Sequence, residues 1–170
     1  MIIIILIAAA ASCNLFYDYR DYAGNGGTIL DGDTVTFTVT VSGATRIMDF
    51  VSVTLSSLSH IYASDLDVSL TSPAGTTVNL FSDIGDYYDF DGTYTITAWD
   101  TFSNDPDPDI TDASNHVTLG VIDQGEYQAE GDISEFENED PNGTWTLTVT
   151  DDFMDGNNGS LGKFIISFGM

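Results

Sequence analysis

Short runs in which apolar and polar residues alternate recur through this chain, and they constrain its fold more than any other feature. The clearest run is residues 34–41, where Val35, Phe37, Val39 and Val41 alternate with four threonines. Successive side chains of an extended strand point to opposite faces, so this run predicts a strand with one buried face. No stretch shows an apolar period of 3.6 residues over three turns, which argues against helices.

Seven further segments carry comparable patterns. They are residues 49–57, 66–70, 78–81, 94–99, 117–121, 145–149 and 164–168. Pro73 and Gly75 interrupt the pattern between two of them, which predicts a turn and makes residues 65–81 a β-hairpin. Apart from the run at 94–99, residues 82–115 are predicted to be mostly loop. Eight short strands without helices predict an all-β domain, a two-sheet antiparallel β-sandwich that is jelly-roll-like.

Residues 1–32 precede the first predicted strand and carry two different signals. Residues 1–13 hold an apolar run that is too short to span a bilayer and ends in small residues before Cys13. This pattern is typical of a signal peptide, and its last residues resemble a lipoprotein leader. Residues 14–32 are rich in Tyr, Asp and Gly without periodicity, which predicts a linker. We therefore expect an exported protein with one domain over residues 33–170, either secreted or lipid-anchored at the bacterial cell surface through Cys13.

The charge balance limits the partners that this chain can bind. It holds 27 Asp and Glu against three Lys and Arg, which gives a formal net charge of -24. Such a negative field disfavours nucleic acid and anionic membranes, and it favours cations, above all calcium with its preference for carboxylate and carbonyl oxygens. Solubility alone is an equally good explanation of an acidic surface. Composition leaves both explanations open.

One group of aspartates has the spacing of candidate calcium ligands. Asp65 and Asp67 are two residues apart, so on an extended strand they would share the outward face at a distance of about 7 Å. Asp83, Asp86 or Asp100 from the predicted long loop could complete a site with them. Ordinary solvated carboxylates are the alternative interpretation.

A second group lies between the last two predicted strands. Asp151, Asp152 and Asp155 occur there in a segment that is rich in Gly and Asn. Several carboxylate and carbonyl oxygens can gather in such a turn and bind calcium. Asn and Gly are also the residues that any tight turn selects, so an ordinary turn is the alternative.

The sequence contains no convincing set of catalytic residues. His60 and His116 are its two histidines, and no G-x-S-x-G motif supplies a serine nucleophile. We expect His60 to end a strand and to form a hydrogen bond with a turn. Zinc is not expected, because two separated histidines and a cysteine in the leader make no closed ligand set. Among 27 acids some pair will have the spacing of a glycosidase by chance, so no such activity is inferred.

Aromatic residues near the predicted loop suggest a different class of function. Tyr87, Tyr88, Phe90, Trp99 and Phe102 could stack on a sugar or on a protein partner. Packing in the core is the simpler explanation for the two tryptophans of the chain, Trp99 and Trp145. A carbohydrate-binding or adhesion module therefore remains an alternative.

Two long motifs occur in order along the chain. Residues 60–76 follow the pattern H-x-Y-x-x-D-L-x-x-x-L-x-S-P-x-G-T. Downstream, residues 125–127, Phe136, residues 139–151 and residues 159–161 form the second set. Together they resemble the two halves of the P domain, also called the P/Homo B domain, at sensible spacing. The similarity covers nearly all of the predicted sandwich.

The resemblance implies a jelly-roll-like sandwich of the kind that lies C-terminal to the catalytic domain of subtilisin-like proprotein convertases. There the P domain packs against the protease and supports its folding, its stability and its response to calcium and pH, without contributing a catalytic residue. A chain of 170 residues leaves no room for such a protease domain beside the sandwich. We therefore expect a noncatalytic protein that stabilises or binds a protein partner, with a separately encoded subtilisin-like protease as the candidate.

Overall fold

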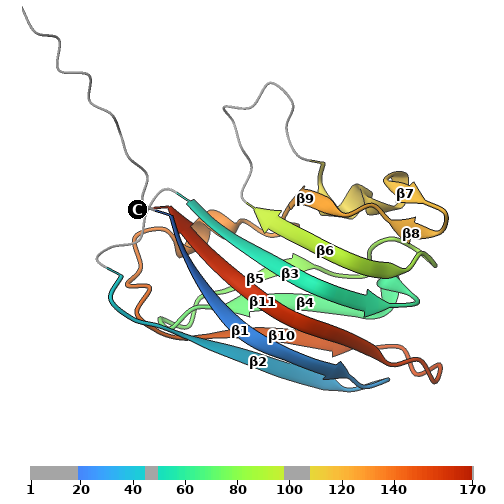
Figure 1. Cartoon of the computed structure of the whole chain (residues 1–170), viewed down its shortest axis with the longest axis horizontal. Coiled ribbons are helices and arrows are strands. Elements are labelled where there is room, and N and C mark those ends of the chain that lie inside the picture. The colour runs from blue at the N-terminus through green and yellow to red at the C-terminus, as the bar shows by residue number, and fades with distance from the viewer. Residues whose placement is uncertain (1–18, 45–49, 98–107, 170) are drawn as a thin grey trace, which may run out of the picture.

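The computed structural model of the chain describes residues 19–44, 50–97 and 108–169 (Figure 1). Predictions that concern residues 1–13, Trp99, Asp100 and Phe102 lie outside these residues. The described strands are β1 (Tyr19–Ile29), β2 (Thr34–Val41), β3 (Phe50–His60), β4 (Leu66–Thr71), β5 (Thr77–Phe81), β6 (Phe90–Thr97), β7 (Val117–Thr118), β8 (Val121–Ile122), β9 (Gly125–Gln128), β10 (Gly143–Asp151) and β11 (Gly159–Gly169). The 3-10 helices are η1 (Ala63–Asp65), η2 (Ile110–Asn115) and η3 (Ile133–Phe136). No described helix is long and apolar enough to cross a membrane.

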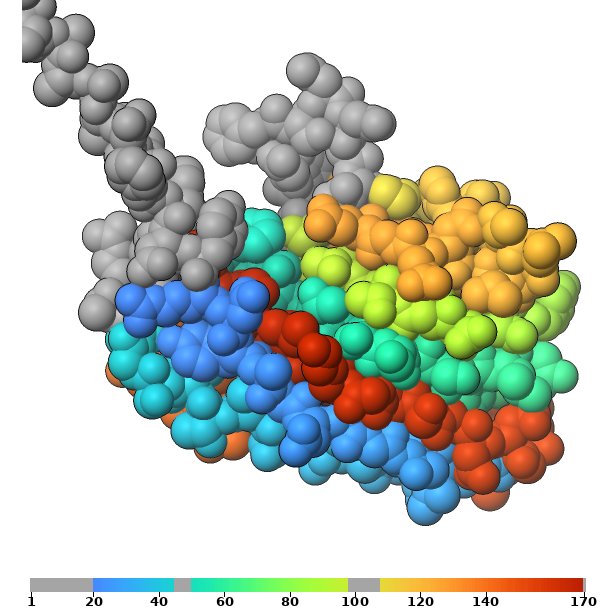
Figure 2. Space-filling model, in the orientation of Figure 1, coloured from blue at the N-terminus to red at the C-terminus, as the bar shows by residue number. Residues whose placement is uncertain are grey.

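The strands form two main sheets. The five-stranded sheet has the order β1-β11-β3-β6-β9, and the four-stranded sheet has the order β2-β10-β4-β5. Figure 2 shows the first four strands of the five-stranded sheet as neighbouring diagonal bands, from blue β1 to yellow-green β6. Neighbours within the main sheets are antiparallel except for β6 and β9, which run parallel. The predicted all-β, two-sheet sandwich is confirmed.

Alternation along the central strands explains how the sheets bury their inner faces. In β2 the threonines are exposed and Phe37, Val39 and Val41 are buried, as the sequence predicts. On the outer face Thr36 and Thr38 lie opposite threonines of β10, and such cross-strand pairs stabilise a sheet. The same period of two therefore produces the core and the polar surface.

Trp145 is one of the largest fully buried side chains of the core. Its side chain is fully buried on β10 and packs against the rings of Phe136 and Phe168, with ring centroids 5.1 and 5.4 Å away. The indole Nε1 donates a hydrogen bond to the carbonyl oxygen of Pro141 at 2.8 Å. Its single polar group is thus satisfied, as a buried Trp requires. The expectation that Trp145 packs in the core is confirmed.

Most of the predicted linker, residues 14–32, is a strand. β1 spans Tyr19–Ile29 and pairs along its length with β11. Its glycines hide the alternation, because they lie where the chain passes close to its neighbour. A Cβ at Gly24 would lie 2.2 Å from the ring of Phe164, and one at Gly26 would lie 2.1 Å from the carbonyl oxygen of Leu161. The linker prediction is therefore wrong for the described residues 19–29.

The hairpin prediction is confirmed, whereas the predicted loop is only partly correct. β4 and β5 pair in antiparallel fashion around the turn, where the Gly75 amide donates to the Ser72 carbonyl at 3.0 Å. In the region predicted to be mostly loop, β6 starts at Phe90, earlier than the run at 94–99 suggests. Gly92 and Thr93 interrupt the alternation there, so the sequence pattern missed the first half of this strand.

Replacing Gly26 by alanine should destabilise the sandwich. The added methyl would collide with the backbone of β11, and overpacking of this kind costs about 1–3 kcal/mol of unfolding free energy. Chemical denaturation of Gly26→Ala and of the wild type measures the difference. Gly125→Ala in β9 is the matched control, because no atom lies within 4 Å of a Cβ there. Equal stability of all three proteins would contradict the assignment of β1 as a packed strand.

Candidate functional site

Candidate ligands gather at one end of the sandwich, which we call the acidic end. Here β1, β3 and β10 end and β4, β6 and β11 begin (right in Figure 1). The acidic end comprises Asp31, Asp65, Asp67, Asp83, Asp151, Asp152 and Asp155. The Asp152 amide donates to the Asp65 carbonyl, and the Asp151 amide donates to the Asp33 carbonyl, both at 3.0 Å. These bonds hold segments together that are remote in the sequence.

His60, the last residue of β3, lies inside the acidic end and is only 1% exposed. Its Nδ1 lies 2.6 Å from the carbonyl oxygen of Tyr62, and its Nε2 lies 3.1 Å from Oδ2 of Asp151. The expectation that His60 ends a strand and contacts a turn is confirmed. Its contact with Asp151 joins residues 91 positions apart, and no sequence pattern indicated it.

Asp65 and Asp151 are buried beside this imidazole, with exposed fractions of 7% and 1%. Oδ1 of Asp151 accepts the Phe153 amide, and Oδ1 of Asp65 accepts the Ser64 hydroxyl, both at 3.3 Å. Oδ2 of Asp65 is buried without a hydrogen-bond partner. Burial raises the pKa of Asp65, and although His60 opposes this shift, the charge of Asp155 adds to it. One ring nitrogen of His60 and one oxygen from each of Asp65 and Asp151 all lie within 4.8 Å of one another.

The prediction that Asp65 and Asp67 share the outward face of one strand is wrong. Asp65 ends the 3-10 helix η1, which begins where the Ala63 amide donates to the Tyr88 carbonyl at 2.8 Å. β4 therefore starts only at Leu66, and Asp65 turns inward. Asp67 alone follows the predicted strand geometry.

Asp67 belongs to a second carboxylate group on the outer side of the four-stranded sheet. Burial raises the pKa of its carboxyl group, and the negative charges of Asp83, Asp152 and Glu130 add to the shift. The backbone amide of Asp83 partly offsets these effects by donating a hydrogen bond to Asp67. Oδ1 of Asp67 is buried without a partner. The predicted association of Asp67 with Asp83 is thus present as proximity, with Asp152 as an additional neighbour.

Asp155 has a local role in the β10–β11 loop. Its carboxylate accepts the Asn157 amide at 3.0 Å and the Asn157 side chain at 2.6 Å. Oδ1 of Asp31 accepts the amides of Asp155 and Gly156 at 2.8 and 2.9 Å, and these bonds lower the pKa of Asp31. Asp86 is exposed in a different loop. The loop at 151–160 is therefore held by hydrogen bonds within the loop and by hydrogen bonds to Asp31.

The surroundings of His60 do not match those of a hydrolase histidine. A serine protease requires one ring nitrogen to face the nucleophilic hydroxyl while the other faces a carboxylate. In this chain Nε2 faces Asp151, and Nδ1 is used by the carbonyl of Tyr62. Among the described residues both nitrogens are thus engaged by groups other than a serine hydroxyl, and the geometry is that of a structural or metal-binding histidine.

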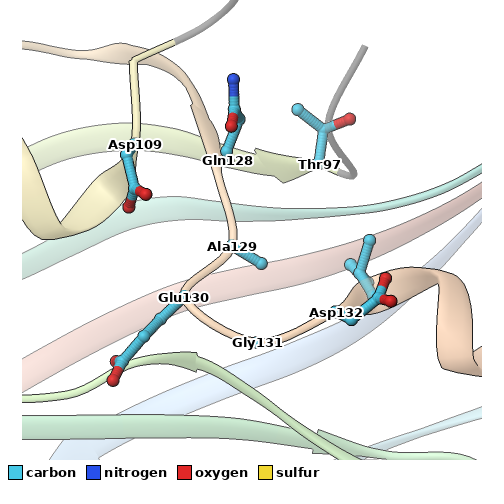
Figure 3. Close-up of a pocket in the computed structure, with 8 residues that line it drawn as sticks. Thr97, Asp109, Gln128, Ala129, Glu130, Gly131 and Asp132 are labelled. Atoms are coloured by element: carbon cyan, nitrogen blue, oxygen red, sulfur yellow. The ribbon is translucent and has the colours of Figure 1, made fainter. Parts of the chain in front are cut away.

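A pocket of about 360 Å³ opens elsewhere, between the end of β6 and the segment after β9. Asp109, Glu130 and Asp132 line it, but Figure 3 shows that their carboxylates point in different directions. Each already accepts hydrogen bonds: Asp109 from Thr111, Asp132 from Ser134, and Glu130 from Asn79 and Ser82 near β5. The described residues that line the pocket therefore form no converging set of ligands.

The like-charged surroundings of Asp67 predict a dependence of stability on pH. Because the folded chain raises the Asp67 pKa above its ordinary 3.8, folding favours the protonated carboxyl. The stability that this group contributes is fully present below pH 3.8 and is lost as the pH rises through the higher folded value. In a chelator, Asp67→Asn should therefore be more stable than the wild type at pH 7, with the difference vanishing in acid. Denaturation midpoints across pH test this, with the exposed Asp86→Asn as control, and equal profiles for wild type and Asp67→Asn would contradict it.

Comparison with known proteins identifies the family. The family model of the proprotein convertase P-domain matches residues 48–168. Among solved structures, the Aeromonas sobria serine protease in complex with its chaperone ORF2 is similar at a TM-score of 0.51 and 17% identity, covering 89% of this chain and 27% of that one. The same protease alone gives a TM-score of 0.49 at 17% identity, covering 90% and 27%.

This chain thus spans about a quarter of the length of those protease structures, and at such identity the likeness concerns the fold. No curated protein sequence matches it. The P domain is an accessory domain family, not a catalytic one. The matched residues cover both motifs and the sandwich from the start of β3 to β11. The chain belongs to the proprotein convertase P-domain family.

Proposed function

We propose that this chain is an exported, noncatalytic module that binds and stabilises a separate protein, and that this partner is a subtilisin-like serine protease. Membership of the P-domain family over residues 48–168 is the observation that carries the proposal. The engagement of both His60 nitrogens supports a noncatalytic role. The composition of residues 1–13 supports export, with secretion or a lipid on Cys13 as the two outcomes.

Exposed apolar side chains offer a docking surface at the acidic end. This apolar rim consists of Leu30, Ile61, Tyr62, Tyr87, Phe153 and Met154, which are 36 to 82% exposed. Met154 lies over Gly32, since a Cβ at Gly32 would be 2.4 Å from its Cγ, so the β10–β11 and β1–β2 loops are neighbours. Apolar groups gathered among charges are typical of interaction sites.

The charge of the chain defines the chemistry of the partner. Aspartates surround the apolar rim, and the whole chain carries a formal charge of -24. A complementary surface presents apolar residues at its centre and Lys or Arg around them. Association with such a surface is accelerated by long-range attraction and slows as salt is added.

Co-expression with a subtilisin-like protease from the same organism tests the proposal. We expect the two proteins to co-elute, and the melting temperature of the protease to rise. Phe153→Ser combined with Met154→Ser should abolish both effects, because it removes two of the most exposed apolar groups of the rim. Leu119→Ser is the matched control, since Leu119 is fully exposed outside the rim. Absence of any complex, or cleavage of casein by the purified chain alone, would overturn the proposal.

A carbohydrate-binding or adhesion module is the alternative function. Tyr87 favours it, because its ring is 76% exposed and lies edge-on to Tyr88 at 6.2 Å. Exposed aromatic rings of this kind can stack on sugars. Binding to a glycan array that is lost in Tyr87→Ala would support this alternative over the protease partner.

We further infer that calcium binds beside β4, at Asp67, Asp83 and Asp152. The buried Oδ1 of Asp67 lacks a hydrogen-bond partner, and several like charges face this carboxylate. A hard cation that prefers oxygen ligands would supply a partner for this oxygen and would reduce the repulsion between the carboxylates. The carboxylates present thus fit the group that the family resemblance implied.

Calcium should therefore stabilise the chain through Asp67. In millimolar Ca²⁺ the melting temperature should rise relative to EDTA, because a ligand that binds only the folded state shifts the unfolding equilibrium. Asp67→Asn should lose most of this rise, whereas Asp86→Asn should keep it. Differential scanning fluorimetry provides the measurement. Identical melting curves with Ca²⁺ and with EDTA would exclude the site.

A further inference from the structure

The buried group of His60, Asp65 and Asp151 places one imidazole against two carboxylates. Nδ1 of His60 contacts both backbone groups of Tyr62, the carbonyl oxygen at 2.6 Å and the amide nitrogen at 3.2 Å. Nε2 faces Oδ2 of Asp151 at 3.1 Å. In the tautomer whose Nδ1 donates to the carbonyl, the Nε2 lone pair faces this carboxylate oxygen, and a metal ion between the two atoms would bind both.

The remaining polar atoms orient these side chains in the way that outer partners orient metal ligands. A metal-binding histidine usually donates its other ring N–H to a carbonyl or carboxylate, and the Tyr62 carbonyl lies 2.6 Å from Nδ1, in place to accept such a bond. Oδ1 of Asp151 is held by the Phe153 amide, and Oδ1 of Asp65 is held by the Ser64 hydroxyl. Oδ1 of each carboxylate is thus held by a neighbouring group of the protein, whereas Oδ2 of Asp151 contacts His60 and Oδ2 of Asp65 has no hydrogen-bond partner.

An independent observation points to a missing ligand. Asp65 is more than nine-tenths buried, and its Oδ2 has no hydrogen-bond partner. A buried carboxylate oxygen without a partner is costly. A proton on His60 Nε2 would satisfy Asp151, but the two buried carboxylates would then face at most one positive charge. A divalent ion would balance the charge of both carboxylates, and Oδ2 of Asp65 could bind to it as a ligand.

We propose that His60 Nε2, Asp65 and Asp151 form a buried site for a divalent metal ion of the Zn²⁺ type, separate from the calcium site beside β4. One imidazole nitrogen and two carboxylate oxygens are donors that Zn²⁺ and Co²⁺ accept, with water in a fourth position. Calcium prefers six to eight oxygen ligands and gains little from a nitrogen. The three donor atoms already lie within 4.8 Å of one another, so small side-chain movements would close them around an ion.

The position of the site indicates a structural role for the ion. His60 belongs to β3 in the five-stranded sheet, whereas Asp151 belongs to β10 in the four-stranded sheet. Asp65 lies between them at the end of η1. The ion would thus connect both sheets to the 3-10 turn at Asp65. This turn lies at the acidic end, which carries the apolar rim.

Titration of the metal-free chain with Co²⁺ tests the proposal, because Co²⁺ in a four-coordinate site absorbs visible light far more strongly than the hydrated ion. We expect about one such Co²⁺ per chain, displaced by Zn²⁺ but not by excess Ca²⁺. His60→Gln and Asp65→Asn should each weaken binding by at least about 100-fold, since outer partners alone are worth 10–100-fold. His116→Gln and Asp86→Asn are matched controls that should bind as the wild type does.

A measurement on the wild type keeps the test independent of whether a variant folds. The ¹⁵N resonance of His60 Nε2 should shift on addition of Zn²⁺, while that of His116 should not. No strongly absorbing Co²⁺, or equal binding by His60→Gln, would show that the ion binds only to surface carboxylates and would overturn the site. An unchanged His60 resonance would show that a proton alone joins His60 to Asp151, and it would overturn the site as well. Neither result bears on protease binding.

Discussion

The buried contact between His60 and Asp151 connects the two sheets of this sandwich at its acidic end. β3 contributes the imidazole and β10 contributes the carboxylate, and neither side chain is accessible to solvent. A third strand takes part, because a Cβ at Gly159 of β11 would lie 2.6 Å from the His60 ring. Removing one partner would leave the other polar group buried without a hydrogen bond, which typically costs about 1–3 kcal/mol of stability. The arrangement of the neighbouring loops depends on this contact, since Asp151 leads into one loop and His60 leads into another.

The scarcity of positive side chains gives this contact its importance. With three Lys and Arg against 27 Asp and Glu, most carboxylates have no basic side chain to pair with. The exposed ones, such as Asp155 and Asp132, instead accept hydrogen bonds from backbone amides in their own turns. Asp65 and Asp67 are enclosed more deeply, and each retains a buried oxygen without a partner. A proton, which the raised pKa of each carboxyl group favours, or a cation from solution would balance them.

Sequence patterns predicted the parts of the fold that depend on local order. The alternation in residues 34–41 predicted β2, and the turn at Pro73 and Gly75 predicted the hairpin of β4 and β5. β1 escaped prediction because glycines at close approaches to β11 replace the alternating side chains. The backbone hydrogen bonds between β1 and β11 hold this segment as a strand although its sequence does not alternate.

The candidate site was predicted in composition but not in arrangement. Spacing predicts Asp65 and Asp67 as ligands, and loop composition predicts Asp83 and Asp151, yet one 3-10 turn separates Asp65 from the strand face that Asp67 occupies. His60 was assigned to a turn, whereas its second contact depends on a residue 91 positions away. Pairings at such separations follow from the packing of sheets and leave no local signature.

The directions of β1 and β11 have a consequence for how the module is presented. Tyr19 pairs with Gly169, so the first and last described strands begin and end together, at the end of the sandwich opposite the acidic end (Figure 1). An eleven-residue strand is about 33 Å long. A lipid or a covalently joined domain ahead of β1 would therefore be attached at the end of the sandwich opposite the acidic end. The acidic end, with its exposed Phe153 and Met154, would then face the surrounding medium.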